Sequence, residues 1–195
     1  MIGIYGSPRK KGNSDLLLDS ALRGAQEQGA DVERVYVRDL EISGCRGCDG
    51  CEKTGECVVQ DDMLDIYPLL DDAGVIILSS PIFFYGLTSQ IKALIDRGQA
   101  MWWKKKLSKE GKDRKNNYGG RGYLIAAGAT RGENLFEGVQ LTARYFFDAL
   151  GMSYEGGLFF RAMESMGAAK EHPEILHKAY DFGKEVIQNS MSVDS

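Results

Sequence analysis

The sequence predicts an α/β protein built on a doubly wound sheet of five parallel strands, with helices on both faces. Short apolar runs alternate with amphipathic segments along the chain, which is typical of successive β-α units. Several of the runs are continuously apolar, as strands are when helices cover both faces of a sheet. Loops rich in glycine and small polar residues follow three of the runs, at the end of the sheet where such folds bind ligands.

Each expected strand ends at a glycine, a serine or a polar segment. The first run, MIGIY, stops at Gly6, and the third, VIIL, stops at Ser79. The second alternates in polarity, the fourth precedes a glycine-rich turn, and Gly156 and Gly157 interrupt the last. The expected strands are residues 1–5, 32–37, 75–78, 123–127 and 152–160.

The expected helices carry apolar residues at helical spacing. Asparagine, serine or aspartate side chains that cap helices precede the first two, and a proline begins the last. Glycines follow the first and the fourth as natural stops. We expect helices from residue 13 or 14 to 28, from 61 or 62 to 70, from about 88 to 103, from 136 to 150, and from 173 towards the C-terminus.

Composition excludes several classes of function. The chain has 195 residues, of which 43% are hydrophobic and 27% charged, as in an ordinary globular protein. Its net charge of −4 argues against a nucleic-acid partner, and no stretch approaches the roughly 20 apolar residues of a membrane span. The opening residues, MIGIYG, have no pattern of a targeting segment, so we expect a cytoplasmic protein whose thiols stay reduced.

The loop after the first strand reads GSPRKKGNS and has the chemistry of an anion site. Small residues let backbone N–H groups approach an anion, and the next helix adds the positive end of its dipole. Hydroxyl and amide groups of Ser7, Asn13 and Ser14 can donate to phosphate oxygens, and Arg9 can neutralise charge. The loop matches neither the dinucleotide fingerprint nor the P-loop. The alternative is an ordinary turn with exposed basic residues.

Two further loops have the composition of a site for a flat ring. SPIFFYG, at residues 80–86, places three adjacent aromatic residues directly after a buried strand. AGATRG, at residues 127–132, is small enough for its backbone to pack on a ring edge and supply N–H donors. Together with the anion loop they predict one site with a phosphate end and a ring end. The alternative is that the aromatic residues only cover the end of the sheet.

All four cysteines, Cys45, Cys48, Cys51 and Cys57, lie in one run, CRGCDGCEKTGEC. Their C-x2-C-x2-C-x5-C spacing allows four thiolates to converge on one centre, as around iron–sulfur clusters. Glycines between the thiols permit the backbone to wrap around such a centre. A [4Fe–4S] cluster, empty reduced thiols, and zinc or a redox disulfide are the alternatives. Zinc is less favoured because structural zinc sites usually split their ligands into two separated pairs.

The chain resembles the NADPH-dependent FMN reductase family of flavodoxin-like proteins over nearly its whole length. The resemblance is carried by GSPRKKGNS, by SSPIFFYGLTSQIKALIDR and by the AAGATRG loop. The cysteine run, continuing as CVVQDDM, is similar to that of the iron–sulfur flavoprotein subgroup, which carries FMN and a [4Fe–4S] cluster. Related flavoproteins also keep such cysteine runs without a cluster.

The resemblance implies positions for FMN in this sequence. Its phosphate would bind to Ser7, Arg9, Asn13 and Ser14. Its isoalloxazine ring would lie against Pro81, Ile82, Phe83, Phe84 and Gly86, with Ala127, Gly128 and Ala129 on the other side. The resemblance also implies a homodimer or homotetramer, in which a neighbouring subunit completes the flavin site.

We expect one flavodoxin-like, FMN-binding domain over residues 1–195, with a cysteine loop at 44–58 and a basic inserted loop at 104–118. The basic segment KKKLSKEGKDRKNN is outside the family pattern. We interpret it as a solvated surface loop. The alternative is a lid whose cations meet the phosphates of NADPH.

The expected function is that of an FMN-dependent oxidoreductase. Electrons would pass from NAD(P)H through the flavin to a quinone, another flavin, a metal ion or a redox protein. No side chain is needed as a general acid or base, so we assign no catalytic residue. One alternative is a non-enzymatic iron–sulfur flavoprotein that exchanges electrons with ferredoxin-like partners. Another is a redox or metal sensor built on the cysteine loop.

Overall fold

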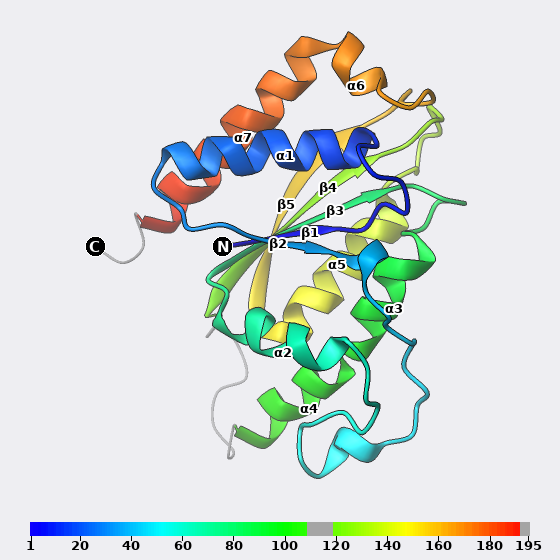
Figure 1. The fold of residues 1–195 in the computed structure, drawn as a ribbon, viewed down its shortest axis with the longest axis vertical. Coiled ribbons are helices and arrows are strands. Elements are labelled where there is room, and N and C mark those ends of the chain that lie inside the picture. Colours follow the sequence, from blue (N-terminus) through cyan, green and yellow to red (C-terminus); the bar gives the residue numbers. More distant parts are fainter. Residues whose placement is uncertain (109–118, 192–195) are drawn as a thin grey trace.

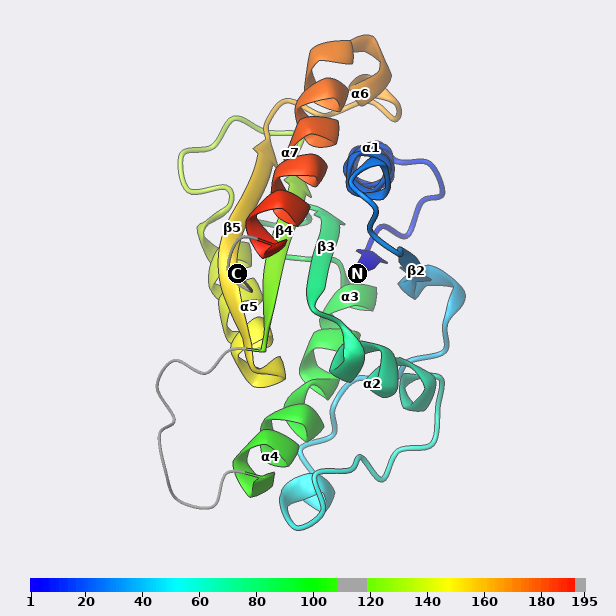
Figure 2. The same cartoon turned by 90° about the vertical axis from the view of Figure 1, so that its left-hand side faces the viewer.

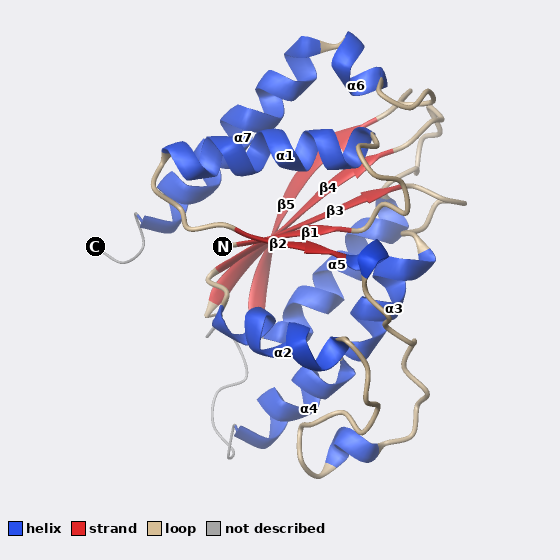
Figure 3. Cartoon of the chain, viewed as in Figure 1, coloured by secondary structure: helices blue, strands red, loops and turns tan. Residues whose placement is uncertain are grey.

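The computed structural model describes residues 1–108 and 119–191, and it confirms the predicted fold class. Five strands form one parallel sheet in the order β2-β1-β3-β4-β5 (Figure 3). The order changes direction between β1 and β3, which is where ligands bind in doubly wound sheets. The strands are β1 (Ile2–Tyr5), β2 (Glu33–Tyr36), β3 (Val75–Pro81), β4 (Gly120–Ala127) and β5 (Met152–Phe160).

Two hydrophobic cores lie on opposite faces of the sheet (Figure 1). The helices α1 and α7 pack side by side on one face, with the short α6 beside them (Figure 2). The helices α2 to α5 cover the other face. The bounds are α1 (Asn13–Glu27), α2 (Met63–Asp72), α3 (Ser89–Arg97), α4 (Gln99–Ser108), α5 (Glu137–Leu150), α6 (Ala168–Glu171) and α7 (Pro173–Met191).

Local chemistry fixes the elements that carry the loops of interest. Thr88 caps α3, because its hydroxyl oxygen accepts from the Ile91 N–H at 3.5 Å. The same hydroxyl donates to the Gly6 carbonyl at 2.5 Å, which joins the start of α3 to the end of β1. Gly151 ends α5 in the left-handed conformation with a φ of 75°, as its position after the helix predicted.

The helix predicted from 88 to 103 is two helices that meet at Gly98. The second, α4, runs on to Ser108, so the prediction of a loop beginning at residue 104 was wrong for residues 104–108. Lysine and leucine are good helix formers, and cations at a helix C-terminus interact well with its dipole. Lys104 also pairs with Asp71, and Lys105 with Asp148 at 3.3 Å. The rest of the basic segment, 109–118, lies outside the described residues.

Two details near the end of the chain differ from a regular pattern. The pairing of β4 with β5 shifts register between Gly122 and Leu124, where β5 carries Gly156 and Gly157 at positive φ. The short helix α6 was not predicted. Among the described residues, no helix is both long and apolar enough to cross a membrane.

Candidate functional site

The loops that follow β1, β3 and β4 lie at the carboxyl edge of the sheet (Figure 1). They line a pocket of about 280 Å³. Most of the residues predicted for the cofactor line it: Ser7, Arg9, Asn13, Ser14, Pro81, Ile82, Phe83, Ala127 and Ala129. Phe84, Gly86 and Gly128 are not among the lining residues. The switch point of the sheet therefore brings together residues that lie far apart in the sequence.

One end of the pocket has the donors that an anion requires. Ser14 lies in the first turn of α1 and is 1% exposed, yet its hydroxyl has no hydrogen-bond partner in the described part of the chain. An unpaired buried hydroxyl costs free energy, so a ligand oxygen at this position would stabilise it. Ser7 is also buried, and exposed Arg9 supplies positive charge at the rim. These residues fit a phosphate group at the N-terminus of α1.

A buried ion pair supports the anion loop from behind. Arg38, in the 3-10 helix η1 (Val37–Asp39), donates from Nη1 to Asp15 Oδ2 at 3.0 Å and to the Ser7 carbonyl at 3.3 Å. The same Asp15 oxygen accepts from the Lys11 N–H at 3.0 Å, and Lys11 has a φ of 60°. Burial raises the pKa of Asp15, while the Arg38 charge acts in the opposite direction. Both ends of the loop are thus fixed.

Asn13 has a different role from the one expected for its side chain. Its Nδ2 donates to the carbonyls of Met163 and Ser165, at 3.3 and 2.9 Å. Its Oδ1 accepts from the N–H groups of Gly167 and Ala169, both at 3.1 Å. These four bonds use both donors and both lone pairs of the amide. Asn13 therefore ties the 163–169 segment to the anion loop, and its contribution to an anion would come from its backbone N–H.

The segment 163–166, between β5 and α6, forms a wall of the pocket that the sequence did not reveal. Its lining residues are Met163, Glu164, Ser165 and Met166. The Met163 N–H donates to the Gly128 carbonyl at 3.0 Å, which joins this wall to the loop after β4. No motif marks the segment, and its place depends on the contacts of Asn13 with residues distant in the sequence.

The aromatic loop after β3 forms a tight hairpin turn. The N–H groups of Phe83 and Gly86 donate to each other's carbonyls, at 3.0 and 2.9 Å. Phe84 and Tyr85 occupy the turn with φ of 49° and 61°, a conformation that glycine and asparagine adopt more easily. Phe84 is fully exposed at the tip, whereas Phe83 lines the pocket. The amides of Phe83, Gly86 and Gly128 are thus paired within the protein.

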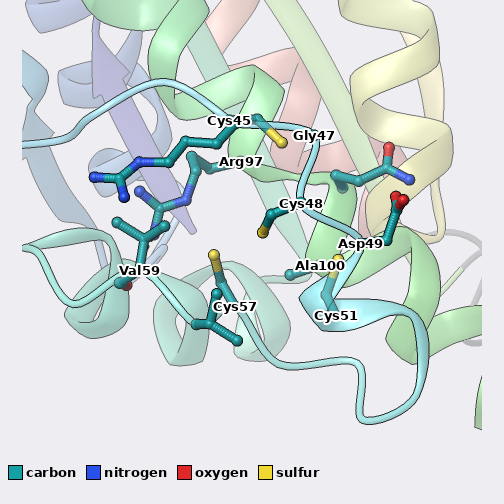
Figure 4. A pocket seen from close by; sticks show the side chains of 12 residues that line it. Cys45, Gly47, Cys48, Asp49, Cys51, Cys57, Val59, Arg97 and Ala100 are labelled. Carbon is teal, nitrogen blue, oxygen red and sulfur yellow. The ribbon is translucent and has the colours of Figure 1, made fainter.

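The cysteines line a second, separate cavity of about 30 Å³ (Figure 4). It shares no lining residue with the first pocket. All four thiols are free, and Cys45 and Cys48 are exposed, whereas Cys51 and Cys57 are partly buried. Burial raises the pKa of the Cys51 thiol. Gly47, Asp49 and Gly55 at positive φ wrap the loop around the cavity.

The cysteine site fits a thiolate-bound group by the chemistry of its donors. Four free thiols on one loop face one hollow, as a cluster of iron and sulfur requires. Within the described ranges, no group of three or more cysteine, histidine or carboxylate side chains is close enough to hold a metal ion. The loop therefore does not hold the thiols at ligand distance from one centre, and this applies equally to zinc and to an iron–sulfur cluster.

Known proteins of similar sequence include iron–sulfur flavoproteins of archaea. One from Archaeoglobus fulgidus is 42% identical over 49% of this chain and 44% of its own length. Another, from Methanocaldococcus jannaschii, is 37% identical over 67% of this chain and 63% of its own length. The matched regions thus span less than two thirds of either relative.

Solved structures show the same fold. An NAD(P)H:quinone oxidoreductase from Methanothermobacter marburgensis superimposes with a TM-score of 0.69 over 94% of both chains, at 13% identity. At that identity the likeness concerns the fold alone. The model of the NADPH-dependent FMN reductase family matches residues 1–159, a span that includes the anion loop, the aromatic loop, the glycine-rich loop and all four cysteines. This chain therefore belongs to the NADPH-dependent FMN reductase family.

Proposed function

We propose that this protein is an oxidoreductase that holds FMN in the pocket at the carboxyl edge of the sheet. The observation that carries the proposal is the Ser14 hydroxyl at the start of α1, which is buried and has no partner among the described residues, in a pocket lined by the loops after β1, β3 and β4. When bound, FMN supplies the redox chemistry, taking electrons from NAD(P)H and passing them to a quinone, a flavin, a metal ion or a protein.

In this proposal the residues of the chain bind FMN, orient its ring and shield it from water. Ser7, Ser14 and the first N–H groups of α1 hold the phosphate, with Arg9 at the rim. Pro81 to Phe83 and the small residues of the 127–129 loop flank the ring. Met163, which is partly buried, gives one wall an apolar surface. No side chain is assigned proton transfer.

Turnover of the FMN-loaded protein tests the enzymatic part. Oxidation of NADPH and NADH is followed in air-free buffer with a water-soluble quinone, free FMN or a ferric chelate as the acceptor. We expect turnover by the loaded protein and its loss in Ser14→Ala at sub-saturating FMN, with Ser89→Ala, an exposed hydroxyl, as the control. Full flavin occupancy without turnover would contradict the enzymatic proposal and favour the electron-carrier alternative.

A second candidate function rests on the cysteine cavity. We propose that Cys45, Cys48, Cys51 and Cys57 hold a [4Fe–4S] cluster, so that electrons also pass to or from a redox protein. The four free thiols around one hollow support this, and two archaeal relatives carry the name iron–sulfur flavoprotein. Iron and acid-labile sulfide are assayed on protein purified without air. About four irons per chain are expected, and an iron-free preparation that resists reconstitution would contradict the cluster.

We also propose that the protein works as a homodimer or homotetramer. The fully exposed Phe84 in the turn after β3 supports this, because a large exposed aromatic side chain is typical of an interface. Light scattering on a sizing column measures the mass in solution. A monomer at micromolar concentration would contradict the proposal.

A further inference from the structure

Arg97 is the largest fully buried side chain among the described residues, and it lies beside the cysteine loop. It is the last residue of α3 and is 1% exposed. Its Nη1 donates to Asp61 Oδ2 at 2.6 Å and to the Ser43 carbonyl at 3.0 Å. Its Nη2 donates to the Val59 carbonyl at 3.2 Å. A single guanidinium thus holds three groups of one loop.

The partners of Arg97 stand at the two ends of the cysteine run. Ser43 precedes Cys45 by two residues, and Val59 follows Cys57 by two. Asp61 reinforces the closure, because its Oδ2 also accepts from the N–H and the hydroxyl of Ser43, at 3.0 and 2.8 Å. The long excursion between β2 and α2 is therefore closed at its base by Arg97 and Asp61, and beside them Asp62 Oδ2 accepts from the Glu41 N–H at 2.7 Å.

Arg97 also lines the cavity that the four thiols face (Figure 4). On the far side of its backbone, the Tyr67 hydroxyl donates to the Arg97 carbonyl at 3.0 Å. Tyr67 lies next to Cys57, and the two side chains line one further pocket. One turn of α3 thus contacts the loop ends, the cavity and, through Tyr67, a thiol.

A buried guanidinium is a costly way to join two chain segments. Burying an ion pair carries a large desolvation penalty, and well-packed apolar residues often serve stability as well or better. Arginine does have one property that apolar residues lack, a planar fork of five donors in fixed geometry. The arrangement uses that fork on two carbonyls and a carboxylate at once.

We propose that Arg97 is the positioning residue of the cysteine site: its guanidinium holds both ends of the loop so that the four thiols face one cavity before any metal binds. The proposal rests on the metal-binding role proposed for the cysteines. Its consequence is that the folded, metal-free protein presents a preformed loop, in contrast to small metal domains that fold only around their metal.

Hydrogen exchange of the metal-free, reduced protein tests the clamp without any cluster. The variants are Arg97→Gln and Arg97→Lys, with Lys92→Met as the control, since Lys92 forms an exposed pair with Asp96 on the same helix. We expect amides of residues 44–60 to exchange at least about tenfold faster in Arg97→Gln. Arg97→Lys keeps the charge but lacks the planar fork of donors, so it should retain part of the protection. The control, Lys92→Met, should retain all of it. Amides of β3 and β4 report in the same spectra whether the fold is intact.

Cadmium binding is the second readout, because soft thiolates bind Cd²⁺ and give a charge-transfer absorption. Loss of a side chain that orients metal ligands typically weakens metal binding by about 10- to 100-fold. We expect that loss in Arg97→Gln, an intermediate affinity in Arg97→Lys, and wild-type affinity in Lys92→Met. If Arg97→Gln unfolds, Asp61→Asn takes its place, because it removes the carboxylate that Arg97 and Ser43 share.

Equal Cd²⁺ affinity and equal loop exchange in wild type and in a folded Arg97 or Asp61 variant would overturn the proposal. Fast exchange of residues 44–60 in the wild type would overturn it as well. The outcome is separate from that of the cluster proposal, because an iron-free protein that resists reconstitution would refute the cluster and leave the exchange result to decide on the clamp.

Discussion

Arg38 and Asp15 form a buried ion pair, 3.0 Å between Nη1 and Oδ2, directly behind the loop proposed to bind the FMN phosphate. Their side chains are 9% and 4% exposed, and they are anchored to the loop through the Ser7 carbonyl and the Lys11 N–H. The pair connects η1, which follows the edge strand β2, with the first turn of α1. The ion pair therefore holds the anion loop in one conformation before a ligand binds.

We expect Arg38→Met to weaken binding of FMN more than binding of riboflavin, which lacks the phosphate. Removing one partner of a buried pair typically costs about 3–5 kcal/mol of stability. If about 1.4 kcal/mol of this free energy is needed to order the loop when FMN binds, the affinity for FMN falls about tenfold. Fluorescence titrations with both ligands measure the ratio, and Asp96→Asn, in an exposed pair, is the control. An equal loss for the two ligands would show that Arg38 does not act through the phosphate loop.

Asn13→Ala should release the 163–169 segment. Four hydrogen bonds are lost, each worth about 0.5–1.5 kcal/mol net, so we expect a stability loss of about 2–6 kcal/mol. Asn13→Asp keeps the two bonds from Gly167 and Ala169, but it sets a carboxylate oxygen against the carbonyls of Met163 and Ser165, so repulsion adds to the two lost bonds and this variant should be destabilised as well. Urea unfolding gives the free energies. Hydrogen exchange of the backbone amides locates the change. Faster exchange throughout the protein, rather than mainly at residues 163–169, would contradict the prediction.

Asp61 should make stability depend on pH in the acid range. Burial alone would raise its pKa, but hydrogen bonds from Arg97 and Ser43 lower it to about 2. Because the folded pKa lies below the usual value near 4, the stabilisation is complete above that value and is lost as the pH falls towards 2. The change amounts to about 1–2 kcal/mol. Urea unfolding at pH 6 and pH 3 measures it, and Asp61→Asn should show a smaller drop between them.

Phe84→Asn should leave stability unchanged or raise it by up to about 1 kcal/mol, since asparagine tolerates the left-handed conformation that Phe84 adopts. The exposed ring makes no packing contribution to offset this gain. If Phe84 contacts a neighbouring subunit, the same variant should shift the mass in light scattering towards the monomer. A marked loss of stability in a monomeric protein would contradict the role of the turn described here.

The sequence predicted the strands and the loops of the site because these depend on local signals. The apolar run VIIL predicted a buried strand, and Gly151 predicted the end of a helix; both predictions used only neighbouring residues. The wall formed by residues 163–166 depends instead on Asn13, more than a hundred residues away, and no local pattern predicts such a contact. Arg97 was part of a recognised motif, yet its role required the partners at Ser43 and Val59. The lysines after Trp103 were read as a loop because their charge suggested exposure, although the same residues form helices well.

The central claim is that the pocket at the carboxyl edge of the sheet binds FMN. Equilibrium titration of the flavin-free protein with FMN, followed by flavin fluorescence and visible absorption, tests it most directly. We predict one FMN per chain, with a shifted flavin spectrum and with binding weakened in Ser14→Ala. A protein that stays colourless and leaves the fluorescence of FMN unchanged would contradict the account.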